Sequence, residues 1–341
     1  MWMGHFGLRP SPTRKTLIML QLLRTLCSAN GCTSTDLRHS RLVTGCLTSL
    51  LACCLSLVSS SAAIAQTELI LKFKAGDVYQ QKVTTSTITG GVVAEKPVKT
   101  TLQQEMLITT KVEAVTEGGA GKLTQVIDQI TLDIDLPNGK SVAYDSNQKE
   151  FSDPLLTALH KTLGLLDGAK FQFTVSPRGE FSEFVIPPEL AQIAKAQPQG
   201  LMGDSLSEAS LRRMFEDTSV SLPQGPITKG ATWNRKTNVK LPIGEIVSHL
   251  TFTYEGPETE TLERIGVGGD IEMTPAEKSP LAVTLNSKKL SGVVLFDKVA
   301  GRVESNQIKQ VLEVTVAAGG QTNDITIESE VKTKLLPAAK E

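Results

Sequence analysis

Apolar and polar residues alternate with a period of two through most of the chain after residue 66. Between Val126 and Leu136, aliphatic side chains fall on one face and mainly Gln, Thr and Asp side chains on the other, and residues 246–254 repeat the pattern. This alternation is typical of antiparallel strands with one face in the core. The same pattern predicts further strands at Glu68–Lys74, Tyr79–Thr89, Gln103–Val115, Phe171–Val175, Phe181–Ile186, Lys289–Phe296, Val303–Val316 and Asp324–Leu335.

Short turn sequences separate several of these strands. Asn138-Gly139 favours the positive φ angles of a type I′ hairpin turn. Ser176–Gly179 has Pro and Gly where a type I turn uses them, and the glycines in residues 118–121 indicate another tight reversal. We therefore expect consecutive strands to pair as hairpins.

Helical patterns are confined to the middle of the chain. Asp153 followed by Pro154 is typical of a helix N-cap and first turn, and Gly168 predicts the end of a helix over 153–166. A second helix is predicted at Pro188–Ala196. A third is predicted after the capping-box sequence Ser205–Glu208, with Leu211, Met214 and Phe215 on its apolar face.

These elements predict a mainly β, antiparallel protein: a curved open sheet or half-barrel, or two related β lobes, with a few helices inserted in the middle. The expected divisions are a first β-rich portion at 66–186, a helical connector at 187–225 and a second β-rich portion at 226–336. The two portions begin alike, because the spacing of Gly76, Tyr79 and Lys82 matches that of Gly230, Trp233 and Lys236. A duplicated β unit and a chance similarity between hairpins both remain open.

An uncharged apolar run at 42–58 follows Arg41 and precedes small residues, which is the pattern of a signal peptide at 42–65. Cleavage is expected after Ala63-Ile64-Ala65, so that the mature, periplasmic or secreted chain begins at Gln66 and has no transmembrane helix. Residues 1–41 are a doubtful extension, disordered or untranslated, with a genuine long leader as the alternative. In a further alternative, Leu50–Cys53 is a lipobox and Cys53 is lipid-anchored.

Removal of residues 1–65 would change both the thiol content and the charge. All five cysteines lie in this segment, so the mature chain would have no disulfide and no thiol chemistry. The segment also holds six Lys or Arg and one Asp, which leaves 29 basic and 35 acidic residues and a net charge of −6. An acidic chain lacks the basic footprint of a nucleic-acid binder.

Five segments resemble a family of uncharacterised exported bacterial proteins, a domain of unknown function. The resemblance covers residues 66 to about 335 and implies export and a mostly β fold, but no activity and no site residues. The segments are LKFKAGDVY at 71–79, VAYDS at 142–146, FTVSPRGE at 173–180, LP at 222–223 with KGATW at 229–233, and SGVVLFDKVAGRV at 291–303.

Several apparent motifs fail on spacing or context. Asp133 and Asp135 lack the sixth-position Gly and twelfth-position Glu of a calcium loop. The glycines at 118–121 and at 266–269 lie between strands, where no helix N-terminus would hold a phosphate. His160 and His249, the two histidines after residue 65, accompany no recognisable nucleophile motif. We therefore predict no catalytic residue, no metal site and no cofactor.

A leucine-rich helix packed across the concave face of a curved sheet can enclose an apolar pocket. The leading interpretation is an exported, non-enzymatic envelope protein that binds or carries an apolar ligand such as lipid or lipoprotein. A structural or protein-interaction module of the envelope and an exported hydrolase without a recognisable motif are the alternatives. The predicted ligand-binding residues are Leu155, Leu156, Leu159, Leu163, Leu166, Phe171 and Phe173.

Overall fold

The computed structural model describes residues 66–93, 96–196, 208–218, 220–241, 244–276, 282–318 and 321–337. The predicted extension, the signal peptide with Ala63 and Ala65, and Cys53 lie outside the described residues, as does Ser205–Ser207 of the predicted capping box. Gln66 is the first described residue and is exposed.

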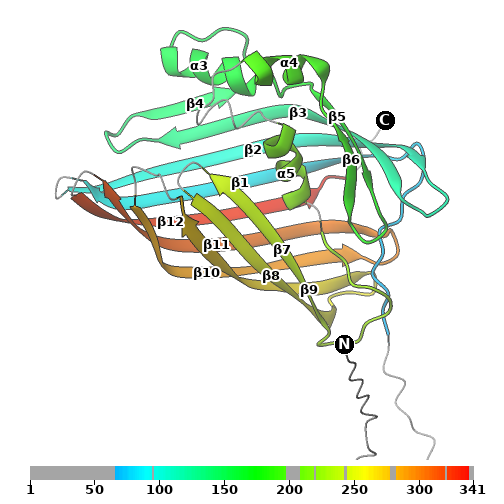
Figure 1. Cartoon of the computed structure of the whole chain (residues 1–341). Coiled ribbons are helices and arrows are strands. Elements are labelled where there is room, and N and C mark those ends of the chain that lie inside the picture. Colours follow the sequence, from blue (N-terminus) through cyan, green and yellow to red (C-terminus); the bar gives the residue numbers. More distant parts are fainter. Residues whose placement is uncertain are drawn as a thin grey trace, which may run out of the picture. The chain divides into compact units, whose positions relative to one another are not determined.

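The described strands form one antiparallel sheet of 12 strands (Figure 1). Their order across the sheet is β6-β5-β3-β2-β1-β12-β11-β10-β9-β8-β7. Strand β4 pairs with residues 131–135 of β3, whereas β5 pairs with residues 121–126 of the same strand. The strands are β1 (Val78–Val93), β2 (Lys96–Val115), β3 (Gly121–Asp135), β4 (Ser141–Asp145), β5 (Lys170–Val175), β6 (Phe181–Val185), β7 (Thr232–Leu241), β8 (Gly244–Pro257), β9 (Leu262–Pro275), β10 (Ala282–Asp297), β11 (Arg302–Ala318) and β12 (Gln321–Leu335).

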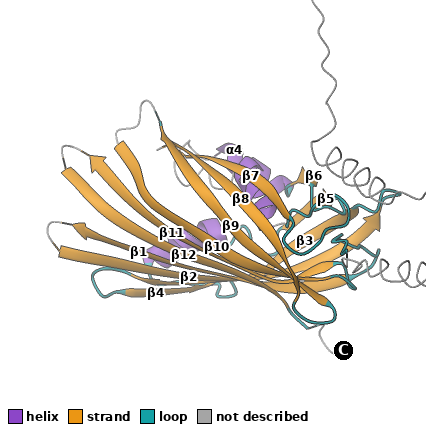
Figure 2. Cartoon of the chain, turned by 90° about the horizontal axis from the view of Figure 1, so that it is seen from below, coloured by secondary structure: helices purple, strands orange, loops and turns teal. Residues whose placement is uncertain are grey.

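The two β-rich portions belong to one continuous sheet, because β1 pairs with β12 from Gln81↔Leu335 to Gly91↔Ile325. The prediction of a mainly antiparallel, curved open sheet is confirmed, and Figures 1 and 2 show its curvature. The chain runs from the centre of the sheet to the β6 edge, and then from the β7 edge back to the centre. The segment between β6 and β7 therefore connects opposite edges of the sheet.

The starts of β1 and β7 have the same local geometry, in keeping with their similar sequences. Gly76 and Gly230 have φ angles of +90° and +88°. The Gly76 N–H donates to the Val112 carbonyl and the Gly230 N–H to the Tyr254 carbonyl, both at 2.8 Å. A residue with a Cβ atom would be strained at both φ angles, which explains the glycine at each position.

Several sequence predictions need correction. Glu68–Lys74 is not a sheet strand, because its backbone bonds to turns instead of to a neighbouring strand. At 136–140 only Gly139 has a positive φ, so the turn is not type I′, which needs two such residues. Strands β7 and β9 were not predicted; in β9 the glycines at 266, 268 and 269 weaken the strand pattern.

The helices are α3 (Pro154–Leu163), α4 (Pro188–Ala196) and α5 (Glu208–Thr218). The Asp153 carboxylate accepts the Leu155 N–H at 2.8 Å, which confirms the predicted N-cap. However, α3 ends at Leu163, before Leu166, because Gly164 caps it and Gly168 lies in the following turn with φ +70°. No residue of α3 is buried, and the helix contacts β4. Figure 1 shows α5, and not α3, inside the curve of the sheet.

The core consists of two neighbouring clusters of buried apolar side chains. The first joins β1–β3, β5 and β6 to Leu190 of α4 and to Leu211 and Phe215 of α5. The second joins β8–β10 to the segment that precedes β7, including Val220 and Leu222. Leu71 packs against both clusters, so the segment before β1 links the two halves of the core.

One strong electrostatic cluster lies on the central strands. The Glu330 carboxylate of β12 accepts a hydrogen bond from the Gln307 side chain. It lies 2.9 Å from the Lys332 ammonium and 3.4 Å from the ammonium of Lys309, the residue paired with Glu330 on β11. The hydrogen bond from Gln307 and then the lysines lower the pKa of Glu330 from 4.5 to about 2. Its charged form therefore stabilises the folded state above about pH 4.5, and this contribution is lost as the pH falls toward 2.

We predict that Glu330→Gln lowers the free energy of unfolding by about 1 kcal/mol at pH 7, a value limited by solvent screening. The difference from wild type should shrink as the pH falls from 5 toward 3, measured by urea denaturation. Glu328→Gln is the control, because Glu328 lies two residues away on the same strand and has no ion pair within the described region. A difference that is independent of pH would contradict the assignment.

The turn between β5 and β6 supplies a second prediction. Gly179 has φ +85°, and a Cβ atom there would collide with the Val220 carbonyl oxygen. Gly139 has φ +78° with open space around it. Gly139→Ala should cost about 1 kcal/mol of unfolding free energy and Gly179→Ala about 3 kcal/mol, since only the second adds a steric clash. Equal urea midpoints for the two variants would contradict this close approach.

Candidate functional site

Residues 67–74, here called the strap, cross one end of the sheet in an extended conformation. Thr67 and Ile227 exchange two backbone hydrogen bonds of 2.8 Å. The Leu71 N–H donates to the Pro177 carbonyl in the β5–β6 turn, and the Lys72 N–H donates to the Gly301 carbonyl in the β10–β11 turn, both at 2.8 Å. The strap therefore connects turns from both halves of the sheet.

Side chains also hold the strap. The Arg178 guanidinium donates to the Leu69 carbonyl at 2.8 Å and to the Glu68 carboxylate at 2.7 Å. Leu69 is fully buried in the second core cluster. The Lys72 ammonium donates to the carbonyls of Lys298 and Val299 at 2.9 and 3.3 Å. The strap is thus fixed by both apolar burial and hydrogen bonds.

A buried polar network lies below the start of the strap. Glu263, 1% exposed, accepts hydrogen bonds from the Tyr254 hydroxyl at 2.6 Å and from the Lys298 ammonium at 2.7 Å. The Thr67 and Tyr254 hydroxyls are 3.1 Å apart. Burial, followed by the hydrogen bond to Glu263, raises the pKa of Tyr254. Because each carboxylate oxygen of Glu263 has a partner, we interpret this network as a structural anchor.

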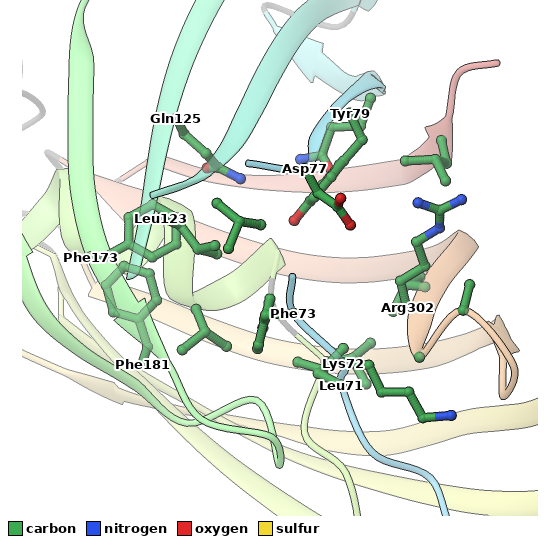
Figure 3. A pocket seen from close by; sticks show the side chains of 18 of the residues that line it. Leu71, Lys72, Phe73, Asp77, Tyr79, Leu123, Gln125, Phe173, Phe181 and Arg302 are labelled. Carbon is green, nitrogen blue, oxygen red and sulfur yellow. The ribbon is translucent and has the colours of Figure 1, made fainter. Parts of the chain in front are cut away.

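The strap, the sheet and α5 line a cavity of about 150 Å³ that is partly open to solvent. Figure 3 shows Phe173, Phe181 and Leu123 together on one side of it, with Phe73 beside them. The Phe173 ring lies 4.5 Å from that of Phe181 and 5.7 Å from that of Phe215, centroid to centroid. The apolar lining residues are Leu71, Phe73, Val112, Leu123, Phe173, Val175, Phe181, Phe215, Val220, Ala300, Val303 and Leu335.

Polar groups occupy the other side of the cavity. Asp77, from the turn before β1, and Arg302, at the start of β11, lie away from Phe173 and Phe181 in Figure 3. Tyr79, Gln81, Gln125 and Lys72 also line it. The pKa of Tyr79 is raised, mainly because the side chain is buried. A hydrogen bond with Thr110 and the positive charge of Arg302 oppose this shift, and the negative charge of Asp77 adds to it. The cavity is therefore amphipathic.

Glycines allow the strap to lie against the strands. A Cβ atom on Gly121 would lie 2.6 Å from the Phe73 ring, and one on Gly301 would collide with the side chain of Lys72. Gly301 also has φ +64°. Both positions therefore favour glycine, and both place strap residues in the cavity wall.

The residues predicted to bind a ligand only partly coincide with this cavity. Among them, Phe173 lines it, while Phe171 and Leu166 are buried in the adjacent core cluster. Leu163 packs against that cluster, Leu156 and Leu159 are half-buried on α3, and Leu155 is 40% exposed. Whether any of these residues binds a ligand stays a prediction.

Sequence reasoning missed the strap, Asp77, Phe215 and Arg302 as possible site residues. A signal was nonetheless present, because three of the five segments that resemble the family meet at the cavity. Residues 71–79, 173–180 and 291–303 supply eleven of its nineteen lining residues. Their glycines and alternating apolar residues build one end of the sheet, which identifies this end as the candidate site.

Other candidate chemistry does not gather at the cavity. Nδ1 of His160 in α3 lies 3.1 Å from the Tyr144 hydroxyl, and the half-buried His249 is 4.0 Å from Glu272. No cluster of three His, Cys, Asp or Glu that could hold a metal occurs in the described ranges. The glycines at 266–269 lie within β9, in keeping with the rejection of a dinucleotide loop. Within these ranges no helix is both long and apolar enough to cross a membrane.

A comparison with protein-family models matches residues 119–303, more than half of the 341 residues, to a family of unknown function, DUF6263. The chain belongs to this family. The matched span contains the β5–β6 and β10–β11 turns and Arg302, whereas the strap precedes it. No curated protein matches the sequence.

Comparisons with solved structures give distant likenesses. Lipovitellin, in a structure on lipid–protein interactions, has a TM-score of 0.46 and 15% identity over 79% of this chain, which spans 26% of the lipovitellin chain. An outer membrane channel from Pseudomonas putida F1 has a TM-score of 0.24 and 7% identity, covering 78% of this chain and 97% of the channel. A putative outer membrane lipoprotein-sorting protein domain from Vibrio parahaemolyticus has a TM-score of 0.14 and 8% identity, covering 76% and 87%.

Proposed function

We propose that this protein is a non-enzymatic binding or carrier protein that holds the apolar tail of a small amphipathic molecule in the cavity beside the strap. The observation that supports this most strongly is the aromatic wall of Phe73, Phe173, Phe181 and Phe215 beside a cavity of about 150 Å³. A cavity of this volume lined by apolar groups is known to hold a molecule the size of benzene. The expected tail is therefore about six carbons long.

The arrangement of the lining residues favours binding over catalysis. The apolar side chains shield a tail from water, while the charged residues lie where a head group would remain solvated. Among the lining residues, one is a carboxylate and none is His or Cys. The acid–base pair that a hydrolase would need is not assembled from these side chains.

The N-terminal sequence supports a location for this proposed activity. The apolar run at 42–58 and the small residues before Gln66 support export, and we propose that the protein acts in the periplasm or after secretion. In that compartment a protein that shields an apolar tail can move an amphiphile through water. Lipid or a lipid fragment is the ligand class that this proposal favours.

A series of straight-chain alcohols from butanol to octanol tests binding of the tail. Each added CH₂ should strengthen binding by about 0.8 kcal/mol, or about fourfold, until about six carbons fill the cavity. Longer alcohols should gain less per carbon, because the additional carbons remain exposed. Isothermal titration calorimetry measures each dissociation constant.

Gln81→Trp should abolish this binding, because Gln81 lines the cavity and an indole would occupy it. Thr84→Trp is the matched control, since residue 84 lies on the opposite face of the same strand and outside the lining. Circular dichroism spectra and urea denaturation midpoints should show that both variants fold. If alcohols fail to bind wild type, or bind Gln81→Trp equally well, the proposed function is wrong.

A further inference from the structure

The cavity has two opposite charges on its polar side. Asp77 lies just before β1 and Arg302 is the first residue of β11, and both are exposed. Their side chains have no ion-pair partner within 4 Å in the described part of the chain, including each other. Two ion pairs lie near this end, Lys298 with Glu263 and Arg178 with Glu68.

Lys72, the third charged lining residue, is engaged by protein atoms. Its ammonium donates to two carbonyls of the β10–β11 turn, as described above. The charges available to a ligand on this side are therefore one carboxylate and one guanidinium.

The charges of Asp77 and Arg302 both affect the side chain of Tyr79. Both charges influence the Tyr79 phenol, in opposite directions, so both lie within electrostatic reach of one hydroxyl group. Figure 3 shows Tyr79 beside Asp77, with Arg302 across the same side of the cavity. A head group of a few atoms placed next to Tyr79 would meet both charges.

We propose that the head group of the bound amphiphile is zwitterionic, with its cationic group held by Asp77 and its anionic group by Arg302. This inference rests on the proposed function, since it concerns the ligand of the same cavity. A purely anionic head group would pair with Arg302 but would meet the Asp77 carboxylate, and a purely cationic one would meet Arg302. A zwitterion pairs with both, and charge complementarity of this kind determines specificity.

Two ligand sources share this chemistry. One is an apolar α-amino acid, whose ammonium and carboxylate are attached to one carbon. The other is a phosphoethanolamine lipid head group, in which a phosphate and an ammonium are separated by two carbons. Both combine an apolar tail with adjacent charges of opposite sign.

The test uses the full chain and compares five ligands with the same six-carbon tail: hexanol, heptanoate, hexylammonium, 2-aminooctanoate and O-hexyl phosphoethanolamine. At least one zwitterion should bind wild type about tenfold more tightly than hexanol at low salt, with a smaller ratio at 0.5 M salt. The zwitterion that binds more tightly identifies the amino acid or the lipid head group as the source.

Two substitutions separate the contributions of the two charges. In Arg302→Gln the zwitterion should bind no better than hexylammonium, and in Asp77→Asn no better than heptanoate. Asp133→Asn and Lys289→Gln change the net charge equally at exposed positions outside the cavity and should leave all affinities unchanged. Hexanol binding should persist in all four variants, which shows that the cavity is intact.

If neither zwitterion binds more tightly than hexanol, or if neither cavity substitution reduces the preference, the head-group proposal is overturned. Hexanol binding under those conditions would leave the proposed function standing. If hexanol also fails to bind wild type, the proposed function fails as well.

Discussion

Pairing between β1 and β12 determines where the remaining parts of the protein can lie. The register from Gln81↔Leu335 to Gly91↔Ile325 joins the first and last strands, so that two strand sets distant in sequence become one sheet. The Leu336 N–H extends this pairing by donating to the Gln80 carbonyl at 2.8 Å. The segment before β1 and the start of β11 consequently lie at the same end of the sheet, where the strap, both turns and the cavity are found.

Contacts around the cavity hold the strap in place. Burial of Leu69 and the hydrogen bonds of Arg178 and Tyr254 fix the strap against the sheet. A ligand tail in the cavity would add apolar contacts and stabilise the same arrangement.

Local patterns in the sequence were sufficient to predict most strands and the starts of the helices. The alternation in Val126–Leu136 corresponds to β3, and Asp153-Pro154 begins α3, because side-chain periodicity and capping act over a few residues. The strap was mistaken for a strand for the same reason. Leu69, Leu71 and Phe73 alternate with polar residues, but the backbone bonds to turns that are far away in sequence.

The candidate site could not be found from local patterns alone. Phe73 and Arg302 line one cavity although they are more than two hundred residues apart; the pairing of β1 with β12 and the bond from Lys72 to Gly301 bring them together. The leucines of α3 had the stronger sequence signal, yet α3 packs beside β4 with no buried residue. Gly121 and Gly301 lie against strap residues, but the sequence does not say which segment approaches them.

We propose that the cavity beside the strap, and not the leucine-rich face of α3, holds an apolar tail. Intermolecular nuclear Overhauser effects between hexanol and the methyl-labelled protein distinguish these two positions. We expect contacts from the hexanol methyl group to the methyl groups of Leu71, Leu123 and Val175, which line the cavity. Contacts to Leu155, Leu156 and Leu159 of α3 instead, with none to the three cavity residues, would contradict it.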